Sequence, residues 1–251
     1  MLLSTSRLEE AKVEAEDGSA GKITTFLFDE EHWVLRYIVV RAGFLSLGGS
    51  VLISPVSVTG PVHGGNSIKV GLTREQIKDA PAADLARPVS RAKEEQFHRY
   101  HKIPVYWGGS GLWGDAMTPM DAGTVTYKPD PEQKPRGSAE EEFHLRSTRE
   151  VEGYDVHAAD EPIGKVADFV MEDSSWRIRY VRAETGDKIG GGHLYVSPQW
   201  VTGISWIEKR LSIEVGRERL KEAPSVGIQG ELSRDDERRL HEFFEQKPYW
   251  E

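Results

Sequence analysis

The chain carries an internal duplication, and the period of that duplication limits the available folds more than any other feature. Residue types recur 143 positions later along most of the first half, as Trp33 and Trp176 illustrate. The same offset relates Gly21-Lys22 to Gly164-Lys165, Ser54-Pro55 to Ser197-Pro198, and Tyr106-Trp107 to Tyr249-Trp250. A period of this length is too long for a solenoid repeat. It predicts two tandem domains of about 100 residues each.

The repeat also predicts the domain boundaries. We expect domains at residues 1–107 and 145–251. Residues 108–144 are rich in Gly, Pro and acidic side chains, a composition that buries little apolar surface, so they predict a flexible linker. The match begins at residue 2, so no targeting segment is expected before the first domain.

Composition restricts the compartment and the class of partner. The chain has no cysteine, so neither a disulfide nor a thiolate site is expected, and a cytoplasmic location fits. No run of about 18 apolar residues occurs, so no membrane span is expected. The formal net charge of −9 is shared between the linker and the second repeat, and the first repeat is neutral. Direct nucleic-acid binding is therefore not expected, because it requires a cationic face.

Short runs of β-branched and aromatic residues, separated by turn residues, predict five or six strands in each repeat. In the first repeat they cover residues 12–15, 22–29, 33–42, 51–54, 56–58 and 67–70. Their spacing of roughly 8–12 residues is typical of a small antiparallel barrel or sandwich. Gly48-Gly49 and residues 190–192, the latter close to Lys188, fit hairpin loops better than a phosphate cradle. The reason is that a strand, and not a helix, follows each loop.

Two short helices are expected after the strands of each repeat. Residues 73–80 and 217–223 each precede a proline that ends the helix. Ser90 and Ser233 are candidate N-caps of the second helix, with a capping box at Ser233. That helix carries apolar positions on one face, namely Phe97, Tyr100 and His101 in one repeat and Leu240, Phe243 and Phe244 in the other. The Tyr-Trp tail after it is expected to fold back onto a barrel, either its own or its neighbour's.

The order of these features resembles the PRC-barrel family, a small β-barrel named after the H subunit of the photosynthetic reaction centre. The resemblance rests on a Gly-Lys pair, an acidic turn, Trp-x-x-Arg-Tyr, a Gly-Gly loop and an aliphatic strand ending in Ser-Pro. The Trp-x-x-Arg-Tyr motif occupies residues 33–37 and 176–180. Because the set occurs twice, the resemblance implies a mainly β fold of two tandem PRC-type barrels. These would be related by a pseudo-twofold, each followed by short helices.

The resemblance also implies a docking and assembly module. The reaction-centre subunit has an N-terminal membrane helix and the ribosome-maturation factor of this family has a preceding domain, so neither role transfers whole. We expect a non-enzymatic scaffold or adaptor that binds protein partners, including the cytoplasmic side of a membrane or photosynthetic-type complex; a homo-oligomer stays open. No catalytic residue and no cofactor is expected, because no Gly-x-Ser-x-Gly elbow or His-Glu-x-x-His motif occurs.

Tryptophan and arginine side chains are the candidate partner-binding residues, because both types are enriched where proteins dock. The motif tryptophans follow charged turns at strand starts, where a large side chain is expected to be half covered. The motif arginines are expected to point outward from the same strands. Internal packing of these tryptophans is the alternative. The candidates are Trp33, Arg36, Trp107, Trp176, Arg179 and Trp250.

A metal- or small-ligand-binding protein is the alternative from a different class. Glu94 and His98, like Glu237 and His241, are four residues apart on a predicted helix, a spacing that suits two metal ligands on one face. The same spacing fits an ordinary contact on a solvated helix face.

Overall fold

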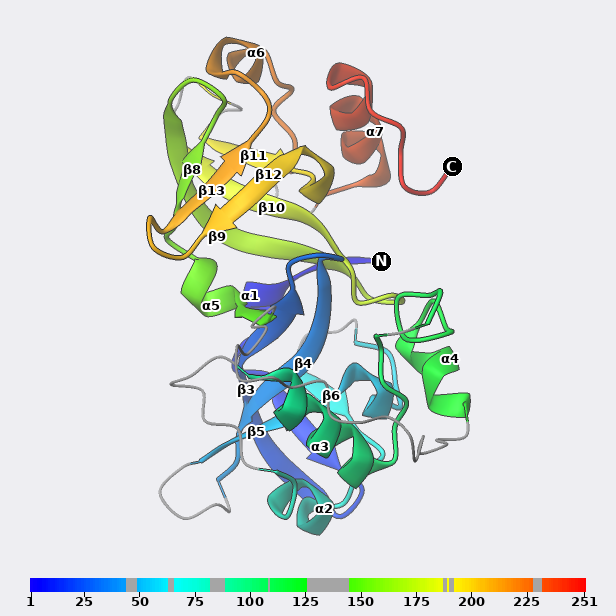
Figure 1. Cartoon of the computed structure of the whole chain (residues 1–251). Coiled ribbons are helices and arrows are strands. Elements are labelled where there is room, and N and C mark those ends of the chain that lie inside the picture. The colour runs from blue at the N-terminus through cyan, green and yellow to red at the C-terminus, as the bar shows by residue number, and fades with distance from the viewer. Residues whose placement is uncertain are drawn as a thin grey trace. The chain divides into compact units, whose positions relative to one another are not determined.

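The structure is a computed structural model that describes residues 1–43, 49–62, 66–81, 89–107, 109–125, 145–186, 189, 192–227 and 232–251. Gly48, Lys188, Gly190 and Gly191, together with residues 126–144 of the predicted linker, lie outside the described residues. The described chain is mainly β, as predicted. It has thirteen strands in two mixed sheets and few helices (Figure 1).

The chain divides into two compact units whose limits differ from the expected boundaries. Unit 1 comprises Met1, Thr5–Arg149 and Glu172–Arg177, and unit 2 comprises Leu2–Ser4, Glu150–Met171 and Ile178–Glu251. The first strand of each repeat therefore belongs to the unit formed mainly by the other repeat. Residues 172–177, at the turn of a hairpin in the second repeat, belong to unit 1.

The sheet of unit 1 has the strand order β5-β4-β3-β2-β6, with β7 also paired to β3. Its strands are β2 (Lys12–Ala15), β3 (Gly18–Asp29), β4 (Val34–Arg41), β5 (Ser50–Ile53), β6 (Ser67–Lys69) and β7 (Leu145–Ser147). Neighbours are antiparallel except for β2 and β6, which are parallel. Every residue from 23 to 29 and from 33 to 40 is buried, so β3 and β4 form the centre of the core.

The sheet of unit 2 has the strand order β11-β10-β9-β8-β13-β12, with β1 also paired to β9. Its strands are β1 (Leu2–Ser4), β8 (Asp155–His157), β9 (Pro162–Glu172), β10 (Ile178–Thr185), β11 (His193–Val196), β12 (Val201–Ser205) and β13 (Arg210–Ile213). β8 and β13 are parallel, as are their equivalents β2 and β6. The duplication therefore extends from the sequence to the strand order.

One repeated glycine is required by the close approach of two strands. A Cβ on Gly21, whose φ is +137°, would lie 2.1 Å from the backbone oxygen of Arg41. A Cβ on Gly164 would lie 1.9 Å from the backbone oxygen of Glu184. Only glycine fits at either position without moving the backbone, which explains why the Gly-Lys pair occurs in both repeats.

The helices are short and follow the strands in the same order in both repeats. Unit 1 contains α1 (Thr5–Leu8), η1 (Pro55–Ser57), α2 (Arg74–Lys78), α3 (Arg91–His101) and α4 (Pro119–Thr124). Unit 2 contains η2 (Pro198–Trp200), α6 (Arg217–Lys221) and α7 (Arg234–Phe243), and the unit boundary falls within α5 (Thr148–Val151). The repeated Ser-Pro starts η1 and η2, where the serine hydroxyl accepts a backbone N–H. The capping box predicted at Ser233 is confirmed, whereas Ser90 makes no side-chain cap hydrogen bond.

Part of the predicted linker belongs to unit 1. Trp113 is 3% exposed, and its indole N–H donates to the Ser175 carbonyl at 2.9 Å. The backbone N–H of Gly114 donates to the Tyr106 carbonyl at 3.1 Å. Thr118 caps α4 by accepting the backbone N–H of Asp121 at 3.2 Å. The buried indole of Trp113 thus attaches residues 109–125 to the rest of unit 1. The Gly-rich composition of this segment had predicted a flexible linker.

Among the described residues, no helix is both long enough and apolar enough to cross a membrane.

Candidate functional site

A buried polar cluster joins α3 to the sheet of unit 1. Tyr37 on β4 is fully buried, and its hydroxyl lies 2.9 Å from Nε2 of His98 and 3.1 Å from Oε2 of Glu94. Glu94 and His98 are 1% and 2% exposed. The predicted pair does share one helix face, but that face packs against the sheet and is not solvated.

The remaining polar atoms of this cluster are also engaged. Tyr106, in the Tyr-Trp tail, donates its hydroxyl to Glu94 at 2.6 Å, and Arg91 pairs with the other Glu94 oxygen at 3.3 Å. His98 Nδ1 lies 2.8 Å from the Pro104 carbonyl. Because a carbonyl can only accept, Nδ1 carries a proton, and Nε2 of the neutral ring faces the Tyr37 hydroxyl. The tail thus folds back onto its own repeat.

Unit 2 repeats the cluster at the equivalent positions. The Tyr180 hydroxyl lies 3.0 Å from His241 Nε2 and 3.2 Å from Glu237 Oε1. Tyr249 donates to Glu237 at 2.7 Å, and Arg234 pairs with Glu237 at 3.0 Å. In each unit, a strand tyrosine, two helix side chains and a tail tyrosine form one network, in which Tyr106 is buried and Tyr249 is half-buried.

Burial shifts the pKa values of side chains in both clusters in the direction that favours their uncharged forms. It lowers the pKa of His98 to about 4, although the neighbouring Glu94 opposes the shift. It raises the pKa of Tyr37 well above its usual value, and Glu94 reinforces that shift. In unit 2, burial lowers the pKa of His241 and raises that of Glu237. Near neutral pH the two histidines are therefore uncharged.

These contacts favour a structural role for the four candidate metal ligands. Both oxygens of Glu94 and of Glu237 already bind tyrosine or arginine, and both histidines use Nε2 for a tyrosine. A metal ion would have to displace these buried partners, each of which would then be left unsatisfied.

A second group of potential ligands lies at the turn between β3 and β4. Single ligand atoms of Asp29, Glu31 and His32 lie within 4.8 Å of one another. However, Asp29 already accepts hydrogen bonds from Arg36 at 2.9 Å and from the backbone N–H of Glu31 at 2.8 Å. Burial would raise the pKa of Asp29, but Arg36 and these N–H groups lower it overall. The carboxylate therefore serves the turn and the buried arginine.

The motif arginines do not point into solvent as expected. Arg36 is 2% exposed, and besides binding Asp29 it donates to the Leu112 carbonyl. Its guanidinium lies 3.9 Å from the centre of the Tyr106 ring. Arg179 is half-buried, with its guanidinium 3.8 Å from the centre of the Tyr249 ring. Stacking against the tail tyrosine draws each arginine inward.

The motif tryptophans are buried, so of the two readings of the sequence internal packing holds and partial exposure does not. Trp33 is 8% exposed and stacks on Phe28 with ring centres 5.4 Å apart, and Trp176 is 2% exposed. Both adopt left-handed backbone conformations, with φ of 56° and 59°. The positive φ closes the hairpin turn and directs the indole into the core.

The tail tryptophans are half-buried against arginines at the start of the helix that precedes each tail, α3 or α7. Trp107 lies under Arg91, with the guanidinium 4.1 Å from the ring centre, and Trp250 lies under Arg234 at 4.2 Å. Of the six candidate partner-binding side chains, these two and Arg179 keep partial exposure.

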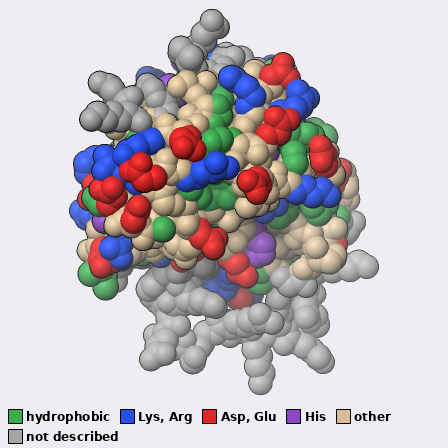
Figure 2. Space-filling view, turned by 90° about the horizontal axis from the view of Figure 1, so that it is seen from above, with side chains coloured by type: hydrophobic (Ala, Val, Ile, Leu, Met, Phe, Trp, Pro, Cys, Tyr) green, Lys and Arg blue, Asp and Glu red, His purple; other side chains and the backbone are tan. Residues whose placement is uncertain are grey.

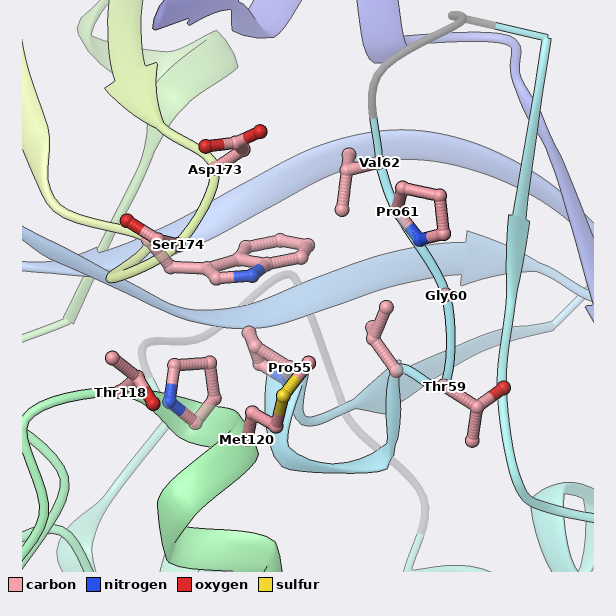
Figure 3. Close-up of a pocket in the computed structure, with 12 residues that line it drawn as sticks. Pro55, Thr59, Gly60, Pro61, Val62, Thr118, Met120, Asp173 and Ser174 are labelled. Atoms are coloured by element: carbon pink, nitrogen blue, oxygen red, sulfur yellow. The ribbon is translucent and has the colours of Figure 1, made fainter. Parts of the chain in front are cut away.

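Unit 1 also contains an apolar pocket that sequence reasoning missed. Its volume is about 450 Å³. Figure 3 shows residues of η1 and α4 on one side, the segment 59–62 on another, and Asp173 with Ser174 on a third. Met120 on α4 is 73% exposed beside it. The apolar lining comes from Pro55, Val58, Pro61, Val62, Pro119, Met120 and Trp176, and we call this pocket the α4 groove.

A difference between the two repeats explains one wall of the α4 groove. In unit 2, β12 continues along β13, with Ile204 opposite Leu211. The residue equivalent to Ile204 is Pro61, which has no N–H to donate to a neighbouring strand. In unit 1 the described pairing is a single bridge between Val58 and Val70, and the chain beyond it lines the groove. The replacement of Ile by Pro was the available sequence signal.

The charged surface shows mixed signs. Figure 2 shows one face on which Lys and Arg side chains lie among Asp and Glu side chains. Ion pairs such as Lys221–Glu218 and Arg238–Asp235, each at 2.5 Å, illustrate this pattern on α6 and α7. On that face, no separate basic surface suited to phosphate is visible.

Comparison of the sequence with models of known protein families and with curated proteins finds no significant match.

Proposed function

We propose that the protein is a non-enzymatic scaffold or adaptor, built from two PRC-barrel-like modules, that docks on a protein partner through the α4 groove. The observation that carries this proposal is a pocket of about 450 Å³ with apolar walls and an exposed methionine at its rim. Apolar surface of this kind is typical of places where proteins accept side chains of a partner.

The composition of the groove supports a protein partner. Met120 is 73% exposed, and methionine adapts its shape to partners of different outline. Three prolines, Pro55, Pro61 and Pro119, give the groove rigid walls, so little ordering is needed on binding. Thr59, Thr118 and Ser174 supply a few polar groups that can orient a bound chain. The family resemblance extends the proposal to a partner within a membrane complex, approached from the cytoplasmic side.

The buried clusters support a scaffold in a different way. The Tyr-Glu-His network holds α3 against the sheet, and with it the Tyr106-Trp107 tail. Gly114 and Trp113, which lead into α4, are attached to this tail and to the hairpin of residues 172–177. A rigid interior therefore positions the groove wall that carries Met120.

The test is capture of partners from the native source at physiological salt, with full-length protein as bait. Met120→Glu places a charge at the groove rim and is expected to abolish capture of the specific partner. The matched control is Ile207→Glu, because Ile207 is 98% exposed and lies in unit 2. Capture that is equal for both variants would remove the groove from the proposal.

A further inference from the structure

The outer edge of β3 receives a strand from the second repeat. In the pairing of β3 with β7, Leu27 lies opposite Ser147, and Asp29 lies opposite Leu145. The equivalent strand of the first repeat, β1, pairs with β9 in unit 2. An exposed strand edge accepts another strand through its free backbone groups, so a further property must decide which strand binds.

Hydroxyl contacts fix the position of β7 on this edge. The Thr25 hydroxyl lies 2.9 Å from that of Ser147 and 3.1 Å from that of Thr148. The first repeat has Ser4 and Thr5 at the equivalent positions. These contacts hold the strand, but either repeat could make them.

Two arginines distinguish the repeats. Arg146 donates to Glu30 at 2.6 Å, and Arg149 pairs with Glu9 at 3.0 Å. The first repeat has Leu3 and Ser6 at the equivalent positions, and neither carries a charge.

The Arg146 pair is the stronger of the two. The side chain of Arg146 is 10% exposed and that of Arg149 is 54% exposed, and a shielded ion pair is screened less than an exposed one. Charge complementarity at Glu30 therefore favours residues 145–147 over residues 2–4 at the β3 edge.

The second repeat also contributes its hairpin to unit 1. The backbone N–H of Leu35 donates to the Trp176 carbonyl at 2.9 Å, and Trp113 donates to Ser175. Asp173, Ser174 and Trp176 line the α4 groove. Part of the groove wall is thus encoded in the second repeat.

We infer that the β3 edge is a strand-binding site whose occupant is residues 145–147 of the same chain, selected over residues 2–4 by the pairing of Arg146 with Glu30. The chain is a fused pair of repeats with exchanged first strands. Unit 1, including its groove, is completed only when the second repeat supplies β7 and the hairpin. This inference does not depend on the adaptor proposal, because it concerns the assembly of unit 1 and not what the groove binds.

Engineered disulfides test the inference directly, because the chain has no cysteine of its own. Directly opposed strand residues lie at a Cα separation that a disulfide can span. The test variant combines Leu27→Cys with Ser147→Cys, and the matched control combines Leu27→Cys with Ser4→Cys. Both carry a protease site inserted within residues 126–144. After oxidation and cleavage, free thiols are titrated and the fragments are separated on a non-reducing denaturing gel.

The test variant is expected to lose both thiols, and its two halves should stay joined until reductant is added. The control is expected to keep both thiols and to give two separate halves. A disulfide in the control, thiols retained in a test variant that unfolds like the parent, or a test disulfide joining two chains would each overturn the inference.

Leu27 is buried, so a second test leaves it intact. Arg146→Glu is expected to lower the midpoint of thermal unfolding, and adding Glu30→Arg should recover most of that loss by restoring the pair with reversed charges. If the double variant loses as much stability as the two single variants lose together, the inference would also be overturned.

Discussion

Acidification is expected to destabilise the protein through the buried histidine of unit 1. The folded-state pKa of His98 is lowered to about 4 by burial, whereas an unfolded histidine titrates near its ordinary value of about 6.5. Between these two values the unfolded chain binds a proton that the folded chain does not. The stability that neutral His98 contributes is therefore fully present above pH 6.5 and is lost as the pH falls toward 4.

The size of the effect follows from the width of this window. Each pKa unit corresponds to about 1.4 kcal/mol, so the full shift corresponds to roughly 3 kcal/mol. The unfolded histidine takes up its proton only below about pH 6.5. The free energy of unfolding is therefore expected to fall by roughly 2 kcal/mol between pH 7 and pH 5. His101, whose pKa burial also lowers to about 4, adds a loss in the same direction. A variant comparison therefore isolates the part that belongs to His98.

The assay is urea unfolding at pH 7, 6 and 5, followed by tryptophan fluorescence. Trp107 lies beside His98, with ring centres 5.2 Å apart, so its signal reports on this cluster. His98→Gln lowers stability at pH 7, because it disturbs the hydrogen bonds to Tyr37 and Pro104. It is also expected to reduce the loss between pH 7 and pH 5 by roughly 2 kcal/mol, because glutamine does not titrate in this range.

The matched control is His32→Gln, since the His32 side chain is 50% exposed and lies outside the cluster. If His98→Gln leaves the pH dependence of the unfolding free energy as steep as in the parent, the burial argument for His98 is refuted. A control that flattens the dependence as much as His98→Gln would refute it equally.

The remaining predictions concern Gly21, where β3 approaches β4 closely, and Trp33 in the turn between these strands. Gly21→Ala is expected to destabilise the protein by at least about 2 kcal/mol in urea unfolding, because its Cβ would overlap the Arg41 carbonyl. Gly43→Ala, with nothing within 4 Å of its Cβ, should have a much smaller effect. Trp33→Ala should cost about 3 kcal/mol, because it empties the space stacked on Phe28. An unchanged unfolding midpoint for Gly21→Ala or Trp33→Ala would contradict these expectations.

The sequence predicted features that depend on local patterns. Runs of β-branched and aromatic residues predicted most strands, and the Ser233 capping box predicted the start of α7, because both signals arise from residues close in the chain. The strand predicted at residues 56–58 is wrong, because Pro55–Ser57 forms the short helix η1 and Val58 makes a single bridge. The polar pair Glu94 and His98 was placed correctly on one helix face. Its burial could not be predicted, because the partner Tyr37 lies 57 positions away from Glu94 along the chain.

The exchange of first strands could not be predicted for a related reason. Leu2–Ser4 and Leu145–Ser147 begin and end with the same residue types, so periodicity alone does not say which sheet each strand joins. The distinguishing contact is the ion pair between Arg146 and Glu30, 116 positions apart. The burial of Trp113 was not predicted, because it lies in a Gly-rich segment whose composition predicted a linker.

The positions at which the two repeats agree and differ bear on the proposed docking role. Both repeats keep the buried tyrosine, glutamate and histidine and the glycine at the close strand approach, so the same contacts stabilise both units. They differ where Pro61 replaces the equivalent Ile204 and where Arg146 replaces the equivalent Leu3. The first difference forms a wall of the α4 groove, and the second favours the strand that completes unit 1. Divergence at these positions, together with the shared Tyr-Glu-His network, fits the proposed docking role of unit 1. We therefore expect groove variants, and not equivalent changes in unit 2, to control partner binding.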